Sequence, residues 1–175
     1  MPNQSSKLIL MTTSDAALKR LAARVGRRLL REQRQVATAE SCTGGWIAKA
    51  LTDVAGSSSW FLEGFITYGN ESKVKRLGVP LALLAKHGSV SQATVRAMAA
   101  GALRRAGAQV AVAVTGIAGP GGAVPGKPVG TVWLGWATCR GGKVRVVAKL
   151  MRFRGNRESV RRKTVRAALL GLLKR

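Results

Sequence analysis

Apolar residues recur every three or four positions near both ends of the chain, a spacing that places them on one face of an α-helix. The first such stretch covers residues 11–32, and Ser14 or Asp15 is available to cap its start. The last runs from about Arg157 to Lys174. The expected inner faces are Leu18, Leu21, Val25 and Leu29 in the first helix and Val160, Val165, Leu169 and Leu172 in the last.

Shorter apolar runs between these helices predict β-strands. Residues 110–114 form an unbroken apolar run, which is typical of a strand buried on both faces. Further strands are expected at 36–39 and 61–68, and an antiparallel pair at 129–138 and 144–151, joined at Gly141-Gly142. The helices expected between strands are 46–52, a short helix capped by Asn70, and an alanine-rich helix from a Ser91 cap to about Ala106.

This alternation of helices and strands predicts an α/β fold, a three-layer α/β/α sandwich with a mixed central sheet. The sheet is expected to be mixed because the late hairpin adds antiparallel strands to it. A length of 175 residues suits one domain. We expect residues 1–10 to be a flexible extension, with Met11 as a second candidate start, and residues 11–175 to form a single domain.

The charge is unusual, since 30 Lys and Arg face 7 Asp and Glu and give a net charge of +23. Such a balance attracts anions, including phosphorylated metabolites and nucleic acid. The plainer interpretation is a solvated basic surface that follows from a composition rich in alanine, glycine and arginine. No apolar run approaches the length of a membrane helix, and no signal peptide is recognised. The two cysteines form no CxxC pair and do not indicate a disulfide framework, so we expect a cytoplasmic location.

The same counts exclude several chemistries. One histidine, His87, rules out a two-histidine metal site, and we expect it in a loop with a structural role. There is no GxSxG nucleophile elbow, and no close pair of carboxylates suggests glycosidase chemistry. Gly121 to Lys127 begins like a phosphate-binding loop, but Pro128 replaces the hydroxyl residue that would bind magnesium.

Several local features carry candidate chemistry, although each alone is weak. Ser41 lies at a strand-to-helix turn, where a following backbone N–H can bind an oxyanion, but it could equally cap the helix. Lys73 lies in a short helix and could be an ordinary solvated lysine. The glycine-rich segment 115–127 could be only a long, flexible connection.

Taken together, these segments resemble the CinA C-terminal domain family, which includes the nicotinamide-nucleotide amidases. They occur in family order across most of the chain. The matching stretches are Thr38-Ala39-Glu40-Ser41-Cys42-Thr43-Gly44-Gly45, Tyr68-Gly69-Asn70-Glu71-Ser72-Lys73, Gly88-Ser89-Val90-Ser91, Thr115-Gly116-Ile117-Ala118-Gly119-Pro120 and Lys127-Pro128-Val129-Gly130-Thr131-Val132.

The resemblance implies a self-associating α/β/α domain that hydrolyses the carboxamide of nicotinamide mononucleotide to nicotinate mononucleotide and ammonia, without metal or cofactor. It also implies the stand-alone form, because the N-terminal domain of the larger members is absent. The residues that fall on catalytic positions are Ser41 as nucleophile, Lys73 as general base and Thr115. Those that fall on substrate-binding positions are Thr43, Gly44, Tyr68, Asn70, Gly116 and Gly119, the last two in a loop expected to close over the substrate.

Elementary chemistry agrees with this assignment, because amide hydrolysis needs a nucleophile, a proton acceptor and oxyanion donors. A lysine base requires a pKa several units below about 10.4, and burial or neighbouring cations would supply that shift. Cys42 is a minor alternative nucleophile, and Glu40 is the next candidate base. No role in the amidase mechanism is expected for the basic stretch Arg152, Arg154, Arg157, Arg161, Arg162 and Lys163.

Two functions from other classes remain open. The charge and the arginine-rich end favour a nucleic-acid-binding or competence-associated regulatory protein. Against this, aromatic residues make up only 5% of the chain, too few for a surface on which many bases stack. An inactive family member acting as a scaffold is the other alternative, and the intact Ser41 and Lys73 argue against it.

Overall fold

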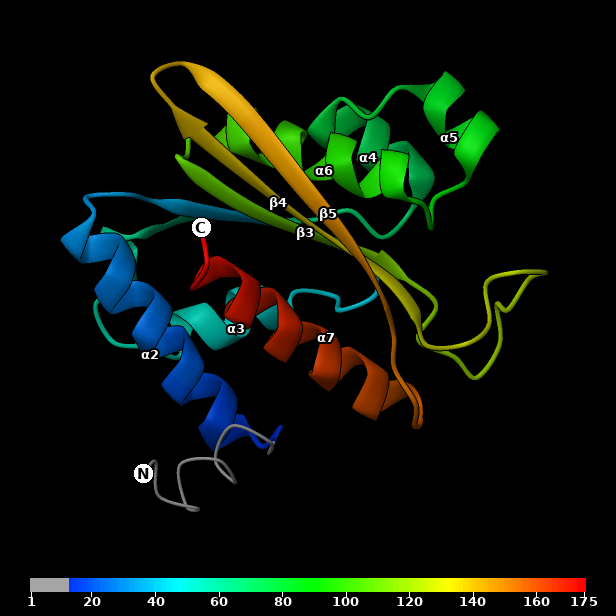
Figure 1. The fold of residues 1–175 in the computed structure, drawn as a ribbon, viewed down its shortest axis with the longest axis horizontal. Helices are drawn as coiled ribbons and strands as arrows, with labels where there is room; N and C mark the ends of the chain where they lie inside the picture. The colour runs from blue at the N-terminus through cyan, green and yellow to red at the C-terminus, as the bar shows by residue number, and fades with distance from the viewer. Residues whose placement is uncertain (1–12) are drawn as a thin grey trace.

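The computed structural model describes residues 13–175, and its centre is a five-stranded mixed sheet (Figure 1). The strand order is β2-β1-β3-β4-β5. β1 is parallel to β2 and β3, whereas β4 is antiparallel to both β3 and β5. The strands are β1 (Val36–Glu40), β2 (Phe61–Ile66), β3 (Val110–Gly116), β4 (Thr131–Arg140) and β5 (Lys143–Arg152).

Helices cover both faces of this sheet and form the expected three layers. In Figure 1, α2, α3 and α7 lie below the strands, and α4, α5 and α6 lie above them. The helices are α2 (Asp15–Arg31), α3 (Trp46–Thr52), α4 (Asn70–Leu77), α5 (Leu81–His87), α6 (Gln92–Ala106) and α7 (Arg157–Leu172), with a 3₁₀ turn at Ser57–Ser59. The α/β/α sandwich with a mixed sheet is therefore confirmed.

The central strand β3 supplies both halves of the core because alternate side chains point to opposite faces. Val110, Val112 and Val114 pack with α2, α3 and α7, while Ala111 and Ala113 pack beneath α6. The inner-face residues expected for the first and last helices are all buried. Small alanines on one face and larger valines on the other let α6 approach the sheet closely.

Some element boundaries differ from the expectations. The first helix begins at Asp15, with the Ser14 hydroxyl accepting from the Ala17 N–H, so a start at Met11 is wrong. Gly69, not Asn70, is the N-cap of α4. His87 ends a helix, α5, that was not expected at all. The proposed extension, residues 1–10, lies outside the described residues.

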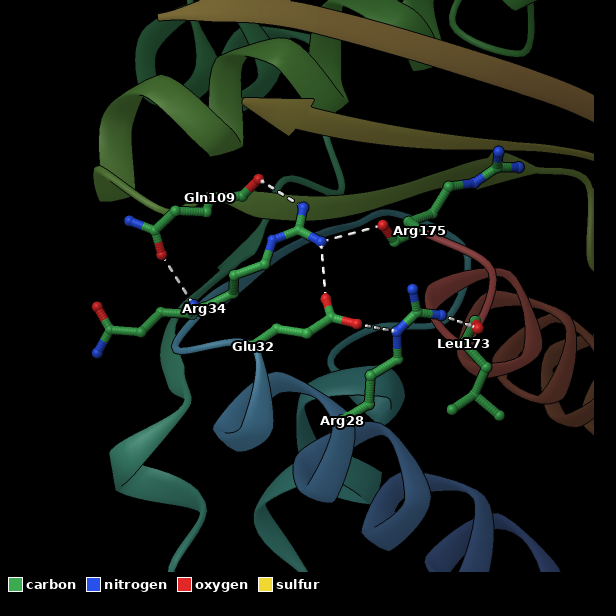
Figure 2. Close-up of polar contacts among 7 residues, drawn as sticks. Arg28, Glu32, Arg34, Gln109, Leu173 and Arg175 are labelled. Carbon is green, nitrogen blue, oxygen red and sulfur yellow. Dashed lines mark hydrogen bonds and ion pairs between the residues drawn. The ribbon is translucent and has the colours of Figure 1, made fainter. Parts of the chain in front are cut away.

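A polar network fixes the end of α7 against the end of α2 (Figure 2). Arg28 pairs with Glu32 at 2.7 Å and also donates to the Leu173 carbonyl. Arg34 donates to Glu32 at 3.1 Å, to the Arg175 carbonyl at 3.0 Å and to the Gln109 carbonyl at 3.4 Å. The hydrogen bond from Arg28 is the main cause of the lowered pKa of the Glu32 carboxyl. The network sets where α7 lies on the sheet.

Candidate active site

The carboxyl ends of the three parallel strands meet at one edge of the sheet, where ligands bind in open α/β folds. Glu40 of β1 is level with Ile66 of β2 and Val114 of β3. The residues that follow these strand positions, Ser41 and Thr67, are tied to the neighbouring strands by backbone bonds: Ser41 N–H to the Val114 carbonyl, and Thr67 N–H to the Glu40 carbonyl. The sheet therefore brings the segments expected to form the site together.

Ser41 and Lys73 form a buried pair at this edge. Lys73 comes from the first turn of α4, and its side chain is drawn inward, so that the residue is only 1% exposed. Its Nζ lies 3.3 Å from Ser41 Oγ, 2.9 Å from the Thr67 carbonyl oxygen and 3.0 Å from the Tyr68 carbonyl oxygen. Burial lowers the pKa of the Lys73 ammonium group below its ordinary value.

The turn that carries Ser41 closes on itself before α3 begins. The Gly44 N–H donates to the Ser41 carbonyl at 3.0 Å. Gly44 and Gly45 have φ values of 60° and 95°, in the left-handed region that side chains other than glycine seldom adopt. Within residues 13–175, no other residue accepts a hydrogen bond from the backbone N–H groups of Cys42 and Thr43. Two free amides thus follow the serine directly.

Cys42, the residue after Ser41, belongs to the hydrophobic core. Its side chain is buried in the core cluster shared by α2, α3 and α7. Burial raises the pKa of its thiol to about 12, so the thiol stays protonated at neutral pH. Only Ser41 of the two adjacent side chains contacts Lys73.

Glu40 anchors the start of α3. Its Oε2 accepts from Thr43 Oγ1 at 2.6 Å and from the Ile47 N–H at 2.9 Å, and its Oε1 accepts from the Ala48 N–H at 2.8 Å. Burial raises the pKa of this carboxyl, and the three hydrogen bonds oppose that rise. Both oxygens are therefore occupied in holding the turn, an arrangement that fits an anchor better than a proton acceptor.

Glu40→Gln should lower the free energy of unfolding by about 1–3 kcal/mol, because an amide N–H₂ would face donors where a carboxylate oxygen now accepts. Urea unfolding checks this value. The matched control is Glu63→Gln in β2, at an exposed position, which should leave stability within about 0.5 kcal/mol. Equal stability of Glu40→Gln and the native protein would contradict the anchoring role.

The other expected site residues lie around the pair, but several have structural partners of their own. Thr43 Oγ1 donates to Glu40, and Thr115 Oγ1 donates to the Ser89 carbonyl at 2.8 Å. Thr115 and Gly116 belong to β3, so the expected connection over 115–127 begins two residues later. A Cβ on Gly116 would lie 2.7 Å from a Val132 methyl carbon, so close packing against β4 accounts for this glycine.

Tyr68 and Asn70 are exposed, whereas Gly119 is buried. Tyr68 is 57% exposed, while its backbone carbonyl contacts Lys73. Asn70 is exposed in the first turn of α4. The Gly119 carbonyl accepts from Arg157 at 2.7 Å, and a second nitrogen of Arg157 donates to the Tyr68 hydroxyl at 2.9 Å.

Sequence reasoning missed the contribution of α7. Arg157 and Arg161 are spaced four residues apart, which places them on one helix face, and both reach the site. Arg161 donates to the Cys42 carbonyl at 3.1 Å and to the Thr43 carbonyl at 2.9 Å. The expectation that the basic C-terminal stretch has no part in the amidase mechanism stays a prediction, but these two residues contact segments of the site. Their spacing of four residues shows that they share a helix face, but not which part of the molecule that face meets.

In residues 13–175, no cluster of three or more His, Cys, Asp or Glu side chains is arranged to hold a metal ion. Across the same residues, no helix combines the length and apolar character needed to span a membrane.

Comparison with known proteins identifies the family. The family profile described as CinA C-terminal domain matches residues 18–175. A protein of Pseudomonas putida named nicotinamide-nucleotide amidohydrolase PncC is 55% identical over 153 residues, covering 87% of this chain and 93% of that protein. The protein of the same name from Escherichia coli K12 is 49% identical over 156 residues, covering 89% and 93%.

Solved structures agree with the sequence comparison. The crystal structure of the competence/damage inducible protein CihA from Agrobacterium tumefaciens has a TM-score of 0.85 at 45% identity and covers 93% of this chain and 97% of that one. A CinA superfamily protein from Klebsiella pneumoniae gives 0.84 at 39% identity, with 90% and 96% coverage. The chain therefore belongs to the CinA C-terminal domain family.

Proposed function

We propose that this protein hydrolyses the carboxamide of nicotinamide mononucleotide, giving nicotinate mononucleotide and ammonia, with Ser41 as nucleophile and Lys73 as general base. The observation that carries the proposal is the buried contact of 3.3 Å between Lys73 Nζ and Ser41 Oγ. The names of the relatives from Pseudomonas putida and Escherichia coli support the substrate class and the reaction.

The surroundings of Lys73 Nζ suit a neutral amine. A neutral amine has two N–H donors and one lone pair, in tetrahedral directions. The carbonyls of Thr67 and Tyr68 take the two donors, at 2.9 and 3.0 Å, which leaves the lone pair for the Ser41 hydroxyl. The ammonium form donates to Ser41 Oγ as well, whereas in the neutral form Ser41 O–H donates to Nζ, the geometry that proton transfer from the nucleophile requires.

The reaction then proceeds in two steps. Ser41 Oγ bonds to the carboxamide carbon while its proton passes to Lys73, and the carbonyl oxygen becomes an oxyanion bound by the free N–H groups of Cys42 and Thr43. The protonated Lys73 gives its proton to the departing nitrogen, the C–N bond breaks and ammonia leaves. Water next attacks the nicotinoyl ester while Lys73 takes its proton. The bond between the acyl carbon and Ser41 Oγ then breaks, Lys73 returns the proton to Oγ, and the carboxylate product is released.

The substrate also carries a cationic ring and an anionic phosphate. The exposed face of Tyr68 suits the pyridinium ring, through a cation–π contact. Arg157 keeps free N–H donors beyond its bonds to Tyr68 and Gly119, and these suit the phosphate. The remaining substrate-binding residues in this proposal are Thr43, Gly44, Asn70, Gly116 and Gly119. Thr115 acts beside the catalytic pair.

The cellular location, assembly and nucleic-acid binding of the protein belong to the same proposal. We propose a cytoplasmic homo-oligomer built from a single domain over residues 11–175. Contact with nucleic acid, where it occurs, is non-specific and electrostatic, and weakens as salt is raised. This follows from a net charge of +23 together with a composition poor in aromatic residues.

Incubation of the purified protein with nicotinamide mononucleotide should release ammonia and nicotinate mononucleotide in equal amounts. The rate should be the same with a chelator or with added divalent metal, because no step uses a metal ion. Coupled ammonia detection and chromatography of the nucleotide check this result. No release at micromolar enzyme would reject the amidase function, and loss of activity in chelator would reject the Ser–Lys mechanism.

A further inference from the structure

Arg161 makes a specific contact with the turn that carries the nucleophile. Its Nε donates to the Cys42 carbonyl and one terminal nitrogen donates to the Thr43 carbonyl, at 3.1 and 2.9 Å. These are consecutive carbonyls, and the planar fork of a guanidinium group matches them in a way that a lysine cannot. A side chain of α7 thus binds the backbone immediately after Ser41.

The consequence follows from the geometry of the peptide group. In a trans peptide the C=O and the N–H point in opposite directions, so holding the Cys42 carbonyl also fixes the direction of the Thr43 N–H. Holding the Thr43 carbonyl fixes the Gly44 N–H in the same way, and that N–H closes the turn onto the Ser41 carbonyl at 3.0 Å. A hydrogen bond to a peptide carbonyl also polarises the N–H of the same peptide and makes it a stronger donor.

The guanidinium group of Arg161 is itself held in place by stacking. It lies over the Trp46 ring, 5.3 Å from the ring centroid. Arg162 contacts the same ring, at 4.7 Å, but its guanidinium group is bound by Asp15 and Glu158 and not by the turn. The polar network between the ends of α7 and α2 holds the C-terminal end of the same helix (Figure 2). The donor is therefore preorganised before substrate arrives.

The charge of Arg161 also reaches the reacting region. Arg161 and Arg157 are the cations that favour ionisation of the Cys42 thiol and so oppose the rise in its pKa caused by burial. The same positive field favours negative charge on an oxyanion next to Ser41. Arg162, by contrast, is held by two carboxylates, which offset its charge.

We infer that Arg161 is a positioning residue for acyl transfer at Ser41, acting through the Cys42–Thr43 and Thr43–Gly44 peptide groups to aim and strengthen the oxyanion-binding amides. This inference takes its substrate from the proposed function, whereas the contacts of Arg161 with the turn do not depend on that function. It assigns to α7 a part in the transition state, in addition to its packing on the sheet.

The test compares Arg161→Lys, which keeps the charge but loses the fork, with Arg161→Met, which loses both. Each should lower kcat for nicotinamide mononucleotide about 10–100-fold, with KM within about 3-fold of the native value, because the aimed amides act on the transition state. The ascending limb of the pH–rate profile should stay in place, since burial sets the pKa of Lys73.

The matched control is Arg162→Met, which removes an equal charge and the other half of the stack on Trp46 but no bond to the turn. It should keep kcat within about 3-fold, even if it melts at a lower temperature. Equal losses of kcat in Arg161→Met and Arg162→Met would show a merely structural role and overturn the inference.

A second measurement tests this inference without using nicotinamide mononucleotide as the substrate. A small fluorophosphonate probe phosphonylates an activated serine: the Ser41 Oγ–P bond forms, the P–F bond breaks, fluoride leaves and the proton passes to Lys73. Both Arg161 variants should react about 10–100-fold more slowly than the native protein, and Arg162→Met at the native rate. This pattern would support the inference even if nicotinamide mononucleotide is not hydrolysed. Equal labelling of all variants, or none of the native protein, would overturn it.

Discussion

Ser41→Ala should lower kcat by at least about 10³-fold while the protein remains folded, because it removes the one nucleophilic side chain that contacts Lys73 Nζ among residues 13–175. The change deletes one oxygen at a nearly buried position whose backbone bonds do not depend on it. Ammonia release from nicotinamide mononucleotide measures the loss, and circular dichroism with thermal melting checks the fold.

The neighbouring cysteine provides the control. Cys42→Ala should keep kcat within about 3-fold, because its thiol is buried in the core, away from Lys73, with a pKa of about 12. It should cost about 1 kcal/mol of stability through lost packing. An active Ser41→Ala together with an inactive Cys42→Ala would reverse the assignment of the nucleophile.

Lys73→Arg and Lys73→Met should each lower kcat about 10²–10⁴-fold, the usual contribution of a positioned general base. Arginine keeps the positive charge but does not deprotonate, so it isolates proton transfer from charge. Lys75→Arg in the same helix is the control, because Lys75 is exposed and pairs with Glu71 at the surface. It should behave as the native protein.

The pH dependence provides a second test of Lys73 in the native protein. Burial lowers its pKa, which means that the neutral amine appears at a lower pH than in a free lysine. Below that pKa the ammonium cannot accept the Ser41 proton, so activity is low, and it rises as pH rises through the lowered pKa. The ascending limb of kcat should therefore lie below the ordinary range of lysine. A Lys73→Arg variant with substantial activity and an unchanged limb would make Lys73 a charge partner only.

Much of the fold could be predicted from the sequence because its signals are local. The unbroken apolar run at 110–114 and the glycines at 141–142 predicted the central strand and the hairpin, and both are confirmed. The helix at residues 81–87 was missed. It is only one and a half to two turns long and buries just Leu84, which leaves too little periodicity to detect.

The site was predicted in part. Resemblance brought Ser41 and Lys73 to attention, and the structure places them in contact, although their catalytic roles remain proposals. Composition and spacing did not predict the partners that fix the turn. Glu40 and Arg161 bind backbone amides and carbonyls, and such bonds leave no pattern in a single sequence. Arg161 also lies 120 residues from Ser41 in the chain, and only the packing of α7 on the sheet brings the two together.

The most direct test of the account is to capture the acyl-enzyme. The protein is mixed with nicotinamide mononucleotide and hydroxylamine, quenched in acid and analysed by mass spectrometry, both for the nucleotide products and for the peptide that contains Ser41. If acylation limits turnover, we expect a hydroxamate of the nucleotide, formed in proportion to hydroxylamine, at an unchanged rate of ammonia release. If deacylation limits turnover, we expect a nicotinoyl ester on Ser41. Ammonia release that yields only the carboxylate, with no ester on Ser41 at any quench time, would contradict a serine nucleophile.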